Sequence, residues 1–407
     1  MYYNKYDSAV HRNFVFIQSI FFKVIGLSPW TLGIFEIFRK QSKANNYQNY
    51  KCKFSYLGSI YNIFLIILMV SLILNVIFNE SFHQLENDSF LTDSIEAKIH
   101  YVSTFATCGV FSTYIIQQKF MINAINRLKS VDEKLIKCAA YKTKSDKIII
   151  VIFIIHFLLF TCEEIVEIYY YPLQSALMRD LPAVINCWIL MQYTIIMDVI
   201  NKRFEMINSA FSKFKRNKGN ASTSQSSSLS NLSILHELFY YDIDNLKYAH
   251  AELCEICQDI GEFFGLPMLV TILHTIETMI ATLFFFIVLS VNVQESDPGT
   301  YLSDVIWLMW IIHGFIVLTS YATRIEKESK KIAGVVDAIM DQCTMDKKMQ
   351  RKLFIFSHAL SHRSVELNVC DIMPLNRTLL QTVAGTIVTY LIILIQFRNC
   401  SSSNQIN

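Results

Sequence analysis

The sequence predicts an all-α, polytopic membrane protein with seven transmembrane helices, and three observations support this prediction. First, 53% of the 407 residues are hydrophobic and only 17% are charged, whereas soluble domains contain about 25% charged residues. Second, seven separate segments are long and apolar enough to cross a bilayer. Third, the basic residues gather in alternate connections between these segments. A mean hydropathy of +0.34 agrees with the first observation.

The seven apolar segments follow one another with polar connections between them. A spanning helix needs about 20 mostly apolar residues, and the first segment contains no charged residue at all. The segments are 57–78, 99–116, 148–166, 181–200, 264–293, 302–321 and 378–397. A buried core helix is the alternative for any single segment. Seven such segments in succession favour membrane spans.

The distribution of Lys and Arg predicts a cytosolic N-terminus and an extracellular C-terminus. Of the 36 basic residues, only Lys98, Arg179 and Arg398 lie outside the N-terminal segment and the connections that follow spans two, four and six. Connections rich in Lys and Arg stay on the cytosolic side of a membrane. The sequons at Asn79 and Asn87 then fall in the first outer loop, where glycans can be attached.

This topology argues against two other classes of membrane protein. A G-protein-coupled metabotropic receptor also has seven helices, but its N-terminus is extracellular. A secondary transporter usually consists of repeated halves, and no internal repeat is visible. Cys254 and Cys257 form a C-x-x-C pair without a second pair, and no phosphate loop, H-E-x-x-H sequence or nucleophile elbow is present. We therefore expect no enzyme, no metal, no cofactor and no nucleic-acid partner.

The long inner connections predict helices on the cytosolic side. The polar run 219–231 is typical of a flexible linker. Apolar residues at helical spacing over 234–260 predict a helix that continues into span five, and 352–370 predicts a further helix. These helices form a bundle either between subunits, which we prefer, or within one subunit. The predicted divisions are a cytosolic segment 1–56, spans one to six with their loops 57–322, anchor helices 323–377, span seven 378–397 and an extracellular tail 398–407.

The seventh span carries a recognisable signature. Its order of Thr389-Tyr390, five hydrophobic residues and Gln396-Phe397 resembles the insect gustatory receptor family. Residues upstream are also similar to that family: Val365-Glu366-Leu367, Cys370, Pro374-Leu375-Asn376 and Thr378-Leu379-Leu380. The resemblance covers 361–397 and is architectural elsewhere. Sugar-sensing members often have an acidic residue directly after the Thr-Tyr pair. Leu391 departs from that pattern, which disfavours a glucose- or sucrose-type ligand.

The resemblance implies a subunit of a tastant-gated, non-selective cation channel in the plasma membrane of a chemosensory neuron. Such channels are related to insect odorant receptors and are tetramers, here a homotetramer or a heterotetramer with related receptors. Four copies of span seven would line the pore, and the cytosolic ends of the later helices would form a central anchor. The implied partners are a sugar or bitter tastant bound in the outer half of the helical bundle, permeant cations and membrane lipids.

The predicted pore and gate residues are Thr389, Tyr390, Ile393, Gln396 and Phe397. On a helix, Thr389 and Gln396 share one stripe, two turns apart. An amide that faced lipid would be costly, so Gln396 is expected to face water or a partner. Rings of amides and apolar side chains can gate ions. The alternative is that Gln396 hydrogen-bonds a neighbouring helix. A ring of Arg398 side chains would repel cations, so these are expected to splay toward headgroups.

The predicted ligand-binding residues are polar and aromatic side chains of the outer half: Glu163, Trp188, Gln192, Tyr193, His274, Glu277, Trp307 and Trp310. Ionisable residues inside a membrane are functional candidates by default. His274 and Glu277 share a helix face, and the alternative is that they pair with each other or with His313. Trp307 and Trp310 also share a face and can stack on a ligand ring. Anchoring at the membrane interface is their alternative role.

Overall fold

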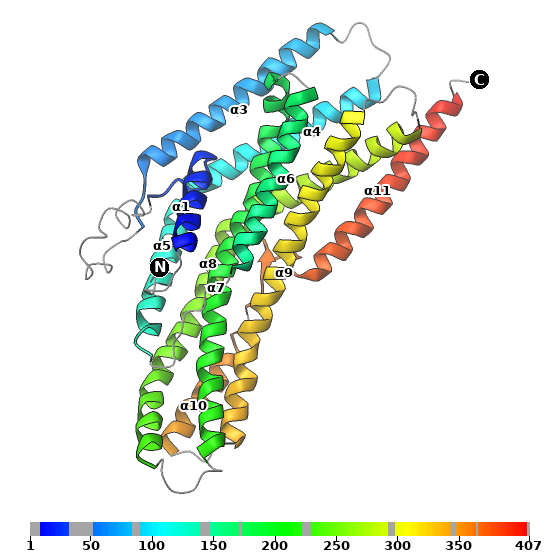
Figure 1. Ribbon diagram of the computed structural model, residues 1–407. Coiled ribbons are helices and arrows are strands. Elements are labelled where there is room, and N and C mark those ends of the chain that lie inside the picture. The colour runs from blue at the N-terminus through cyan, green and yellow to red at the C-terminus, as the bar shows by residue number, and fades with distance from the viewer. Residues whose placement is uncertain are drawn as a thin grey trace.

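Helices dominate the structure, which is a computed structural model (Figure 1). It describes residues 9–31, 52–83, 90–138, 147–170, 173–221, 229–291, 298–342, 347–363 and 365–404. The helices are α1 (Ala9–Val24), α3 (Tyr56–His83), α4 (Phe90–Ile116), α5 (Gln118–Leu135), α6 (Ile148–Tyr170), α7 (Leu173–Ala221), α8 (Leu229–Val291), α9 (Pro298–Gln342), α10 (Lys347–Ser361) and α11 (Arg377–Asn404). Two short strands, β1 (Asn368–Val369) and β2 (Met373–Pro374), separate α10 from α11. The predicted all-α fold is confirmed.

Six helices in the described part of the chain are long and apolar enough to cross a membrane. They are α3, α6, α7, α8, α9 and α11. The apolar part of α4, Tyr101–Ile116, is shorter. Each predicted span coincides with one of these seven helices. The chain is therefore a multi-pass membrane protein.

Three helices are much longer than a bilayer requires. Helix α8 has 63 residues, which confirms that 234–260 continues into the fifth span. Helices α7 and α9 have 49 and 45 residues. Figure 1 shows all three running through the molecule, with α10 at one end and with α3 and α11 on opposite flanks. We call the part around α10 the distal bundle: α5, α10, 201–221 of α7, 229–262 of α8 and 322–342 of α9.

The connection between α7 and α8 is shorter than the sequence predicts. Helix α7 continues to Ala221 and α8 begins at Leu229. The predicted linker 219–231 is thus reduced to 222–228, which lies outside the described residues. At the other end of the chain, α11 extends past the predicted end of span seven to Asn404.

The prediction of a helix over 352–370 was wrong after Ser361. Helix α10 ends there, and β1 and β2 form an antiparallel pair in which Val369 lies opposite Met373. Val365, Leu367 and Val369 are buried while their neighbours are more exposed, a period of two that is typical of a strand. Cys370 and Asp371 have φ values of 50° and 56°, so the chain turns back on itself between the strands.

The N-terminal segment enters the helical core, although the sequence analysis assigned 1–56 only as a cytosolic segment. Helix α1 and the stretch that follows it bury Phe22, Leu27 and Trp30, each at most 4% exposed. The side-chain amide of Asn62 donates to the Gly26 carbonyl at 3.0 Å. Gly26 has a φ of 82°, and a Cβ there would lie 2.7 Å from the side chains of Leu65 and Phe111. The segment is therefore fixed against α3 and α4 at a position that only glycine fits.

Candidate functional site

Helices α6 and α9 face each other along a line of polar and aromatic side chains, which we call the α6–α9 seam. It pairs Tyr170 with Gly299, Glu167 with Ser303, Phe160 with Trp310, and His156 with His313. Along this line the residue number rises on α6 as it falls on α9, by nearly equal steps. The two helices are therefore antiparallel and keep one register. The same register places Glu163 level with Trp307.

Close contacts are present in this register at the end that holds Tyr170 and Gly299. A Cβ at Gly299 would lie 2.3 Å from the ring of Tyr170, so a larger residue there would require the Tyr170 side chain to move. One turn further, the Ser303 hydroxyl donates to a carboxylate oxygen of Glu167 at 2.8 Å. Both side chains are buried. The seam is thus a tightly packed interface that includes an intramembrane carboxylate.

The predicted aromatic residues Trp188 and Trp310 gather at the middle of the seam. Both are fully buried. The ring of Trp188 lies 4.8 Å from that of His156 and 5.9 Å from that of Phe160. Trp310 and Trp307 meet edge to face at 5.3 Å. Trp310 lies in the interior, as a ligand wall would, and not at an exposed membrane interface.

A hydrogen-bonded pair of histidines lies beside these tryptophans. The indole N–H of Trp310 donates to Nε2 of His156 at 3.0 Å, and Nδ1 of His156 lies 3.2 Å from Nδ1 of His313. The sequence analysis did not select His156, and it considered His313 only as a partner for His274 or Glu277. The sequence signal for this pair was one histidine near the middle of each of two apolar segments, His156 in 148–166 and His313 in 302–321. It could not be used without the relative register of the two helices.

Gln192 and Tyr193 face a different group of helices. The Tyr114 hydroxyl donates to the Gln192 side-chain oxygen at 2.5 Å, and the Gln192 amide donates to the Leu27 carbonyl at 2.6 Å. Gln192 thereby holds the N-terminal segment in the core. The Tyr193 ring packs on Phe264 of α8, with centroids 5.0 Å apart. A role for either residue in ligand binding stays a prediction.

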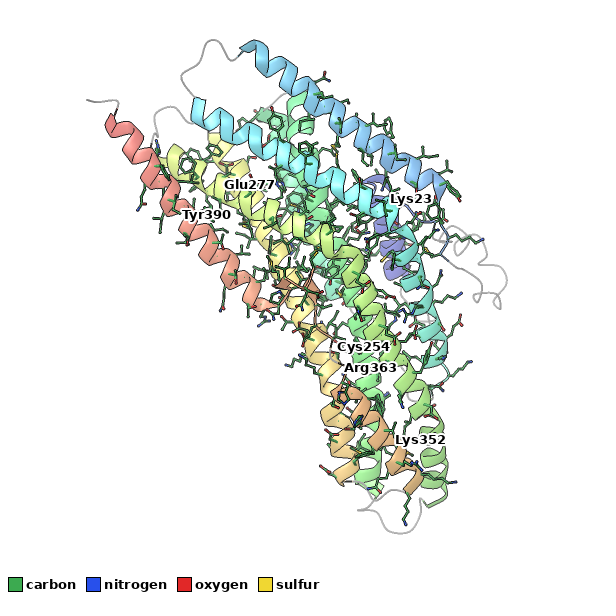
Figure 2. All side chains as sticks on the ribbon, turned by 180° about the vertical axis from the view of Figure 1, so that it is seen from behind. Lys23, Cys254, Glu277, Lys352, Arg363 and Tyr390 are labelled. Carbon is green, nitrogen blue, oxygen red and sulfur yellow. The ribbon has the colours of Figure 1, made fainter. Side chains whose placement is uncertain are left out.

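His274 and Glu277 lie on α8. His274 is 3% exposed, and its ring nitrogen lies 3.5 Å from the Thr278 hydroxyl. Glu277 is half-buried. Figure 2 shows Glu277 in the same half of the molecule as Tyr390 of α11, away from Arg363 and from Cys254 and Lys352 of the distal bundle. Both residues remain candidates for the outer half.

Helix α11 turns a stripe of mostly polar residues away from its own chain, and we call this the polar stripe. It consists of Thr378, Thr382, Gly385, Thr389, Ile392 and Gln396, all of them exposed. These residues recur every three or four positions, so they share one face. The buried Leu379 and Val383 lie on another face, toward α8 and α9. The Thr389 hydroxyl donates to the Gly385 carbonyl at 2.9 Å, which leaves its lone pairs on the exposed face.

The other predicted gate residues lie off this stripe. Successive helical residues are about 100° apart, so Tyr390 and Phe397 point sideways from Thr389 and Gln396. They are 53% and 69% exposed. Ile393 borders the stripe at 38% exposed. Arg398 follows Gln396 by two positions and is half-buried, so its charge lies on nearly the opposite side of α11.

The predicted glycosylation sites and the cysteine pair add little to the site. Asn79 lies within α3, and Asn87 lies outside the described residues. Cys254 is 3.7 Å from Nδ1 of His250. Within the described ranges, no group of three or more His, Cys, Asp and Glu side chains is arranged to hold a metal ion.

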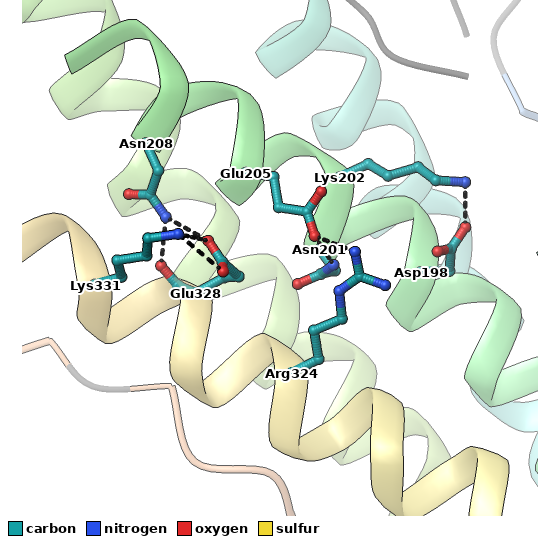
Figure 3. Close-up of polar contacts among 8 residues, drawn as sticks. All are labelled: Asp198, Asn201, Lys202, Glu205, Asn208, Arg324, Glu328 and Lys331. Atoms are coloured by element: carbon teal, nitrogen blue, oxygen red, sulfur yellow. Dashed lines mark hydrogen bonds and ion pairs between the residues drawn. The ribbon is translucent and has the colours of Figure 1, made fainter. Parts of the chain in front are cut away.

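Ion pairs join the helices of the distal bundle. Figure 3 shows those between α7 and α9, where Arg324 pairs with Glu205 at 2.6 Å and Asn208 donates to Glu328 at 2.9 Å. Arg127 of α5 contacts three acids of α8: Glu252 at 2.6 Å, Glu255 at 2.7 Å and Asp259 at 2.6 Å. Partial burial alone would lower the pKa of Arg127, but these acids, Glu252 foremost, raise it above its ordinary value. The guanidinium therefore stays charged.

Arg127→Ala is expected to lower the free energy of unfolding by about 2 kcal/mol, because the partly buried Glu252 and Asp259 and the exposed Glu255 lose their shared cation. Thermal unfolding of the purified protein in detergent measures this loss. Lys129→Ala is the matched control, since Lys129 of the same helix pairs with the exposed Glu133 at a longer distance, 3.8 Å. Its effect should stay below about 0.5 kcal/mol. Equal melting temperatures for the two variants would show that the Arg127 contacts do not stabilise the bundle.

The fold and the site together define a multi-pass helical membrane protein with a polar interior seam and a polar stripe on its last helix. A family model described as 7tm chemosensory receptor matches residues 16–399. The chain belongs to this family, and the resemblance found in span seven is confirmed.

Gustatory receptors of Drosophila melanogaster are similar to parts of the chain. "Putative gustatory receptor 28a" of Drosophila melanogaster is 32% identical over 179 residues, which are 41% of this chain and 39% of that protein. The same organism's "Gustatory receptor for sugar taste 43a" is 22% identical over 38% of this chain and 36% of its own length. The matched regions thus cover about two fifths of these relatives.

The fold is that of a solved insect receptor. The olfactory receptor OR5 from Machilis hrabei superposes with a TM-score of 0.61 over 96% of this chain and 100% of that chain, at 12% identity. A second structure of OR5, in complex with eugenol, has a TM-score of 0.59 over the same shares. At this identity the likeness defines the fold.

Proposed function

We propose that the chain is a subunit of a tastant-gated cation channel whose pore is lined by the polar stripe of α11. The observation that carries this proposal is the exposure of Thr378, Thr382, Thr389 and Gln396 on a helix that is apolar enough to span a membrane. Polar groups are costly in hydrocarbon. A face that is polar and turned away from its own chain therefore belongs against water or against other subunits.

Helix α3 provides the contrast within the same molecule. It is also mostly exposed, but its outward residues are large and apolar, among them Leu57, Ile60, Ile63, Phe64 and Ile67. Such a face is suited to lipid. The exposed faces of these two spanning helices thus differ in polarity: that of α3 is apolar and the stripe of α11 is mostly polar. This difference favours lipid as the environment of α3 and an aqueous pore as the environment of the α11 stripe.

The hydroxyl and amide oxygens of the stripe suit cations. Each Thr of the stripe from Thr382 to Thr389 donates its proton back to its own helix, so its oxygen lone pairs face outward. Rings of such acceptors can replace the water around a permeant cation. Arg398, the nearest positive charge on α11, lies on nearly the opposite side and would not face that axis. The assembly is a homotetramer or a heterotetramer with related receptors, as the resemblance to gustatory receptors implies.

The tastant is proposed to bind at the α6–α9 seam, which combines the predicted residues Glu163, Trp188, Trp307 and Trp310. The complex of OR5 with eugenol supports a small aromatic ligand within this fold. Leu391 stands where sugar-sensing members often have an acid, so a bitter or aromatic compound is favoured over a sugar. The protein would act in the plasma membrane of a chemosensory neuron, with its N-terminus inside and its C-terminus outside.

A metabotropic receptor is the alternative from another functional class. A channel and a metabotropic receptor differ in membrane topology and in how fast current follows the ligand. In expressing cells, a channel should pass cation current within milliseconds of ligand, and blocking G proteins should not change it. An antibody tag at the N-terminus should be detected only after the cells are permeabilised. Surface detection of that tag on intact cells would contradict the proposed topology.

Gln396→Ala is expected to change the relative permeability of the channel to Na⁺, K⁺ and Ca²⁺ and to alter its basal leak. The amide lies on the polar stripe, and removing it deletes an acceptor from the proposed axis. Whole-cell recording with exchanged external cations measures both properties, and the leak needs no known ligand. Phe397→Ala is the control, because its side chain points sideways. If both variants keep the permeability and leak of the unchanged channel, Gln396 does not line the pore.

A further inference from the structure

The His156–His313 pair has a proton arrangement that its neighbours determine. The indole of Trp310 is a donor only, so Nε2 of His156 must accept the bond that joins them at 3.0 Å. A neutral histidine then carries its proton on the other nitrogen, Nδ1. That nitrogen lies 3.2 Å from Nδ1 of His313, to which it donates. His313 must therefore carry its own proton on Nε2.

The chain of bonds ends in a donor that is accessible. Among the described residues, Nε2 of His313 bonds to no acceptor. It is not among the buried polar atoms that are both unpaired and closed off from the surface, so it is accessible. The His313 ring is half-buried. Its Nε2–H thus reaches the outside of the packed chain, whereas His156 is 1% exposed.

The surroundings of this donor are apolar. Met309 and Ile316 lie one turn away on the same face of α9 and are 55% and 49% exposed, and the adjacent Ile312 is 46% exposed. His313 is twelve residues past Tyr301 at the start of the apolar segment, or about 18 Å along the helix. That depth is near the middle of a bilayer core of about 30 Å. Lipid ester groups lie at the interface, so they do not supply an acceptor there.

We propose that His313 presents its Nε2–H to a hydrogen-bond acceptor oxygen of a small, apolar, membrane-partitioned ligand, and that His156 and Trp310 are positioning residues that hold His313 in this donor form. An N–H left without an acceptor at this depth is costly, and a ketone, ether or ester oxygen on an aromatic or aliphatic body satisfies it. The proposal rests on the proposed function for its ligand site, and it adds the ligand's class: neutral, apolar and carrying an acceptor.

Trp310 can be tested separately from packing. In Trp310→Phe, the ring remains but the donor to His156 is lost. His156 can then carry its proton on Nε2 and accept from His313, which turns Nε2 of His313 into an acceptor. This variant should keep its affinity for the apolar body of a ligand and lose its preference for an acceptor oxygen. A role in packing alone would not change that preference.

The experiment uses benzophenone, an apolar ketone that inserts into nearby C–H bonds under ultraviolet light without another reagent. The full-length receptor in phosphatidylcholine nanodiscs is labelled, and the modified peptides are identified by mass spectrometry. The label should fall within 147–170 or 299–321. Excess acetophenone should suppress it, and ethylbenzene, which has the same shape but no oxygen, should compete about fivefold less well, the value of one neutral hydrogen bond.

Variants complete the test. His313→Leu should reduce labelling about fivefold, His313→Gln should retain it because an amide N–H can replace Nε2–H, and Trp310→Phe should bring acetophenone and ethylbenzene to equal competition. His358→Gln, an exposed imidazole of α10, is the unaffected control, and melting temperatures identify misfolded variants. Labelling elsewhere, no labelling, or equal competition in the unchanged protein would overturn the proposal. Labelling of the seam without any current would support this site and contradict the channel function. Current without labelling of the seam would support the channel function and contradict this site.

Discussion

Gly385→Leu is expected to reduce the current at least about tenfold while leaving the amount of receptor at the cell surface unchanged. A Cβ at Gly385 would meet no atom within 4 Å of its own chain, and leucine favours a helix more than glycine does. The fold of the single chain therefore tolerates the change. Gly385 lies in the polar stripe, so four leucines would meet at the proposed axis, where an apolar constriction stops ions by dewetting. Whole-cell recording and surface biotinylation measure the two quantities.

Two substitutions serve as controls for this result. Ala384→Leu adds similar bulk one position earlier, where the exposed side chain points about 100° away. Gly334→Leu adds it on α9 in the distal bundle, where a Cβ also meets nothing within 4 Å. Both should carry near-normal current. Normal current in Gly385→Leu would show that the polar stripe faces something other than the pore. Equal loss in Gly385→Leu and Ala384→Leu would point to a general defect of α11.

The face of α11 that holds Gly385 and the face that holds Ala384 show what could be predicted from the sequence and what could not. Helical periodicity alone placed Thr389 and Gln396 on one stripe, because residues seven apart are two turns apart. Periodicity could not say which stripe faces the other helices of the chain. That depends on the packing of Leu379 and Val383 against α8 and α9, which a single helix pattern does not contain. The structure thereby shows that the stripe of Thr389 and Gln396 is turned away from the other helices of the chain.

The seam was predicted in its parts but not in its connections. Trp188, Trp310 and Glu163 were selected because polar and aromatic residues are unusual within apolar segments, and all three are buried. The pairing of His156 with His313 joins residues 157 positions apart. It follows from the register between α6 and α9, in which Tyr170 packs against Gly299 and Ser303 donates to Glu167. No local pattern in the sequence records that register.

The N-terminal segment shows a different reason for an incomplete prediction. Its eight basic residues before span one were interpreted as a signal for topology, and the apolar residues between them were not used. Helix α1 has 16 residues, fewer than the roughly 20 that a span needs. Phe21 nevertheless packs against Trp188, with ring centroids 4.4 Å apart. A short apolar helix can enter the core without crossing the membrane.

Gly58→Ala is expected to lower the free energy of unfolding by about 3 kcal/mol, a large effect for the addition of one methyl group. Gly58 lies near the start of α3, where a Cβ would come within 1.9 Å of the Pro29 carbonyl oxygen and 2.8 Å of its Cα. Because both contacts are with backbone, no side-chain rotation relieves them. The stretch around Pro29 must move, and Leu27 and Trp30, both buried, move with it. Thermal unfolding of the purified receptor measures the loss.

Gly109→Ala is the matched control, since Gly109 also lies in a helix but a Cβ there meets nothing within 4 Å. Adding a methyl group at such a position should stabilise the protein by up to about 1 kcal/mol, so the two variants are expected to shift the melting temperature in opposite directions. The displaced segment also carries the Leu27 carbonyl that accepts from Gln192. Gly58→Ala would then free the Gln192 amide in the core, and unpaired buried amides add to the cost. If the melting temperature of the Gly58→Ala variant is no lower than that of the Gly109→Ala variant, the N-terminal segment does not pack against α3 in the folded receptor. Leu27 and Trp30 would then not belong to its core.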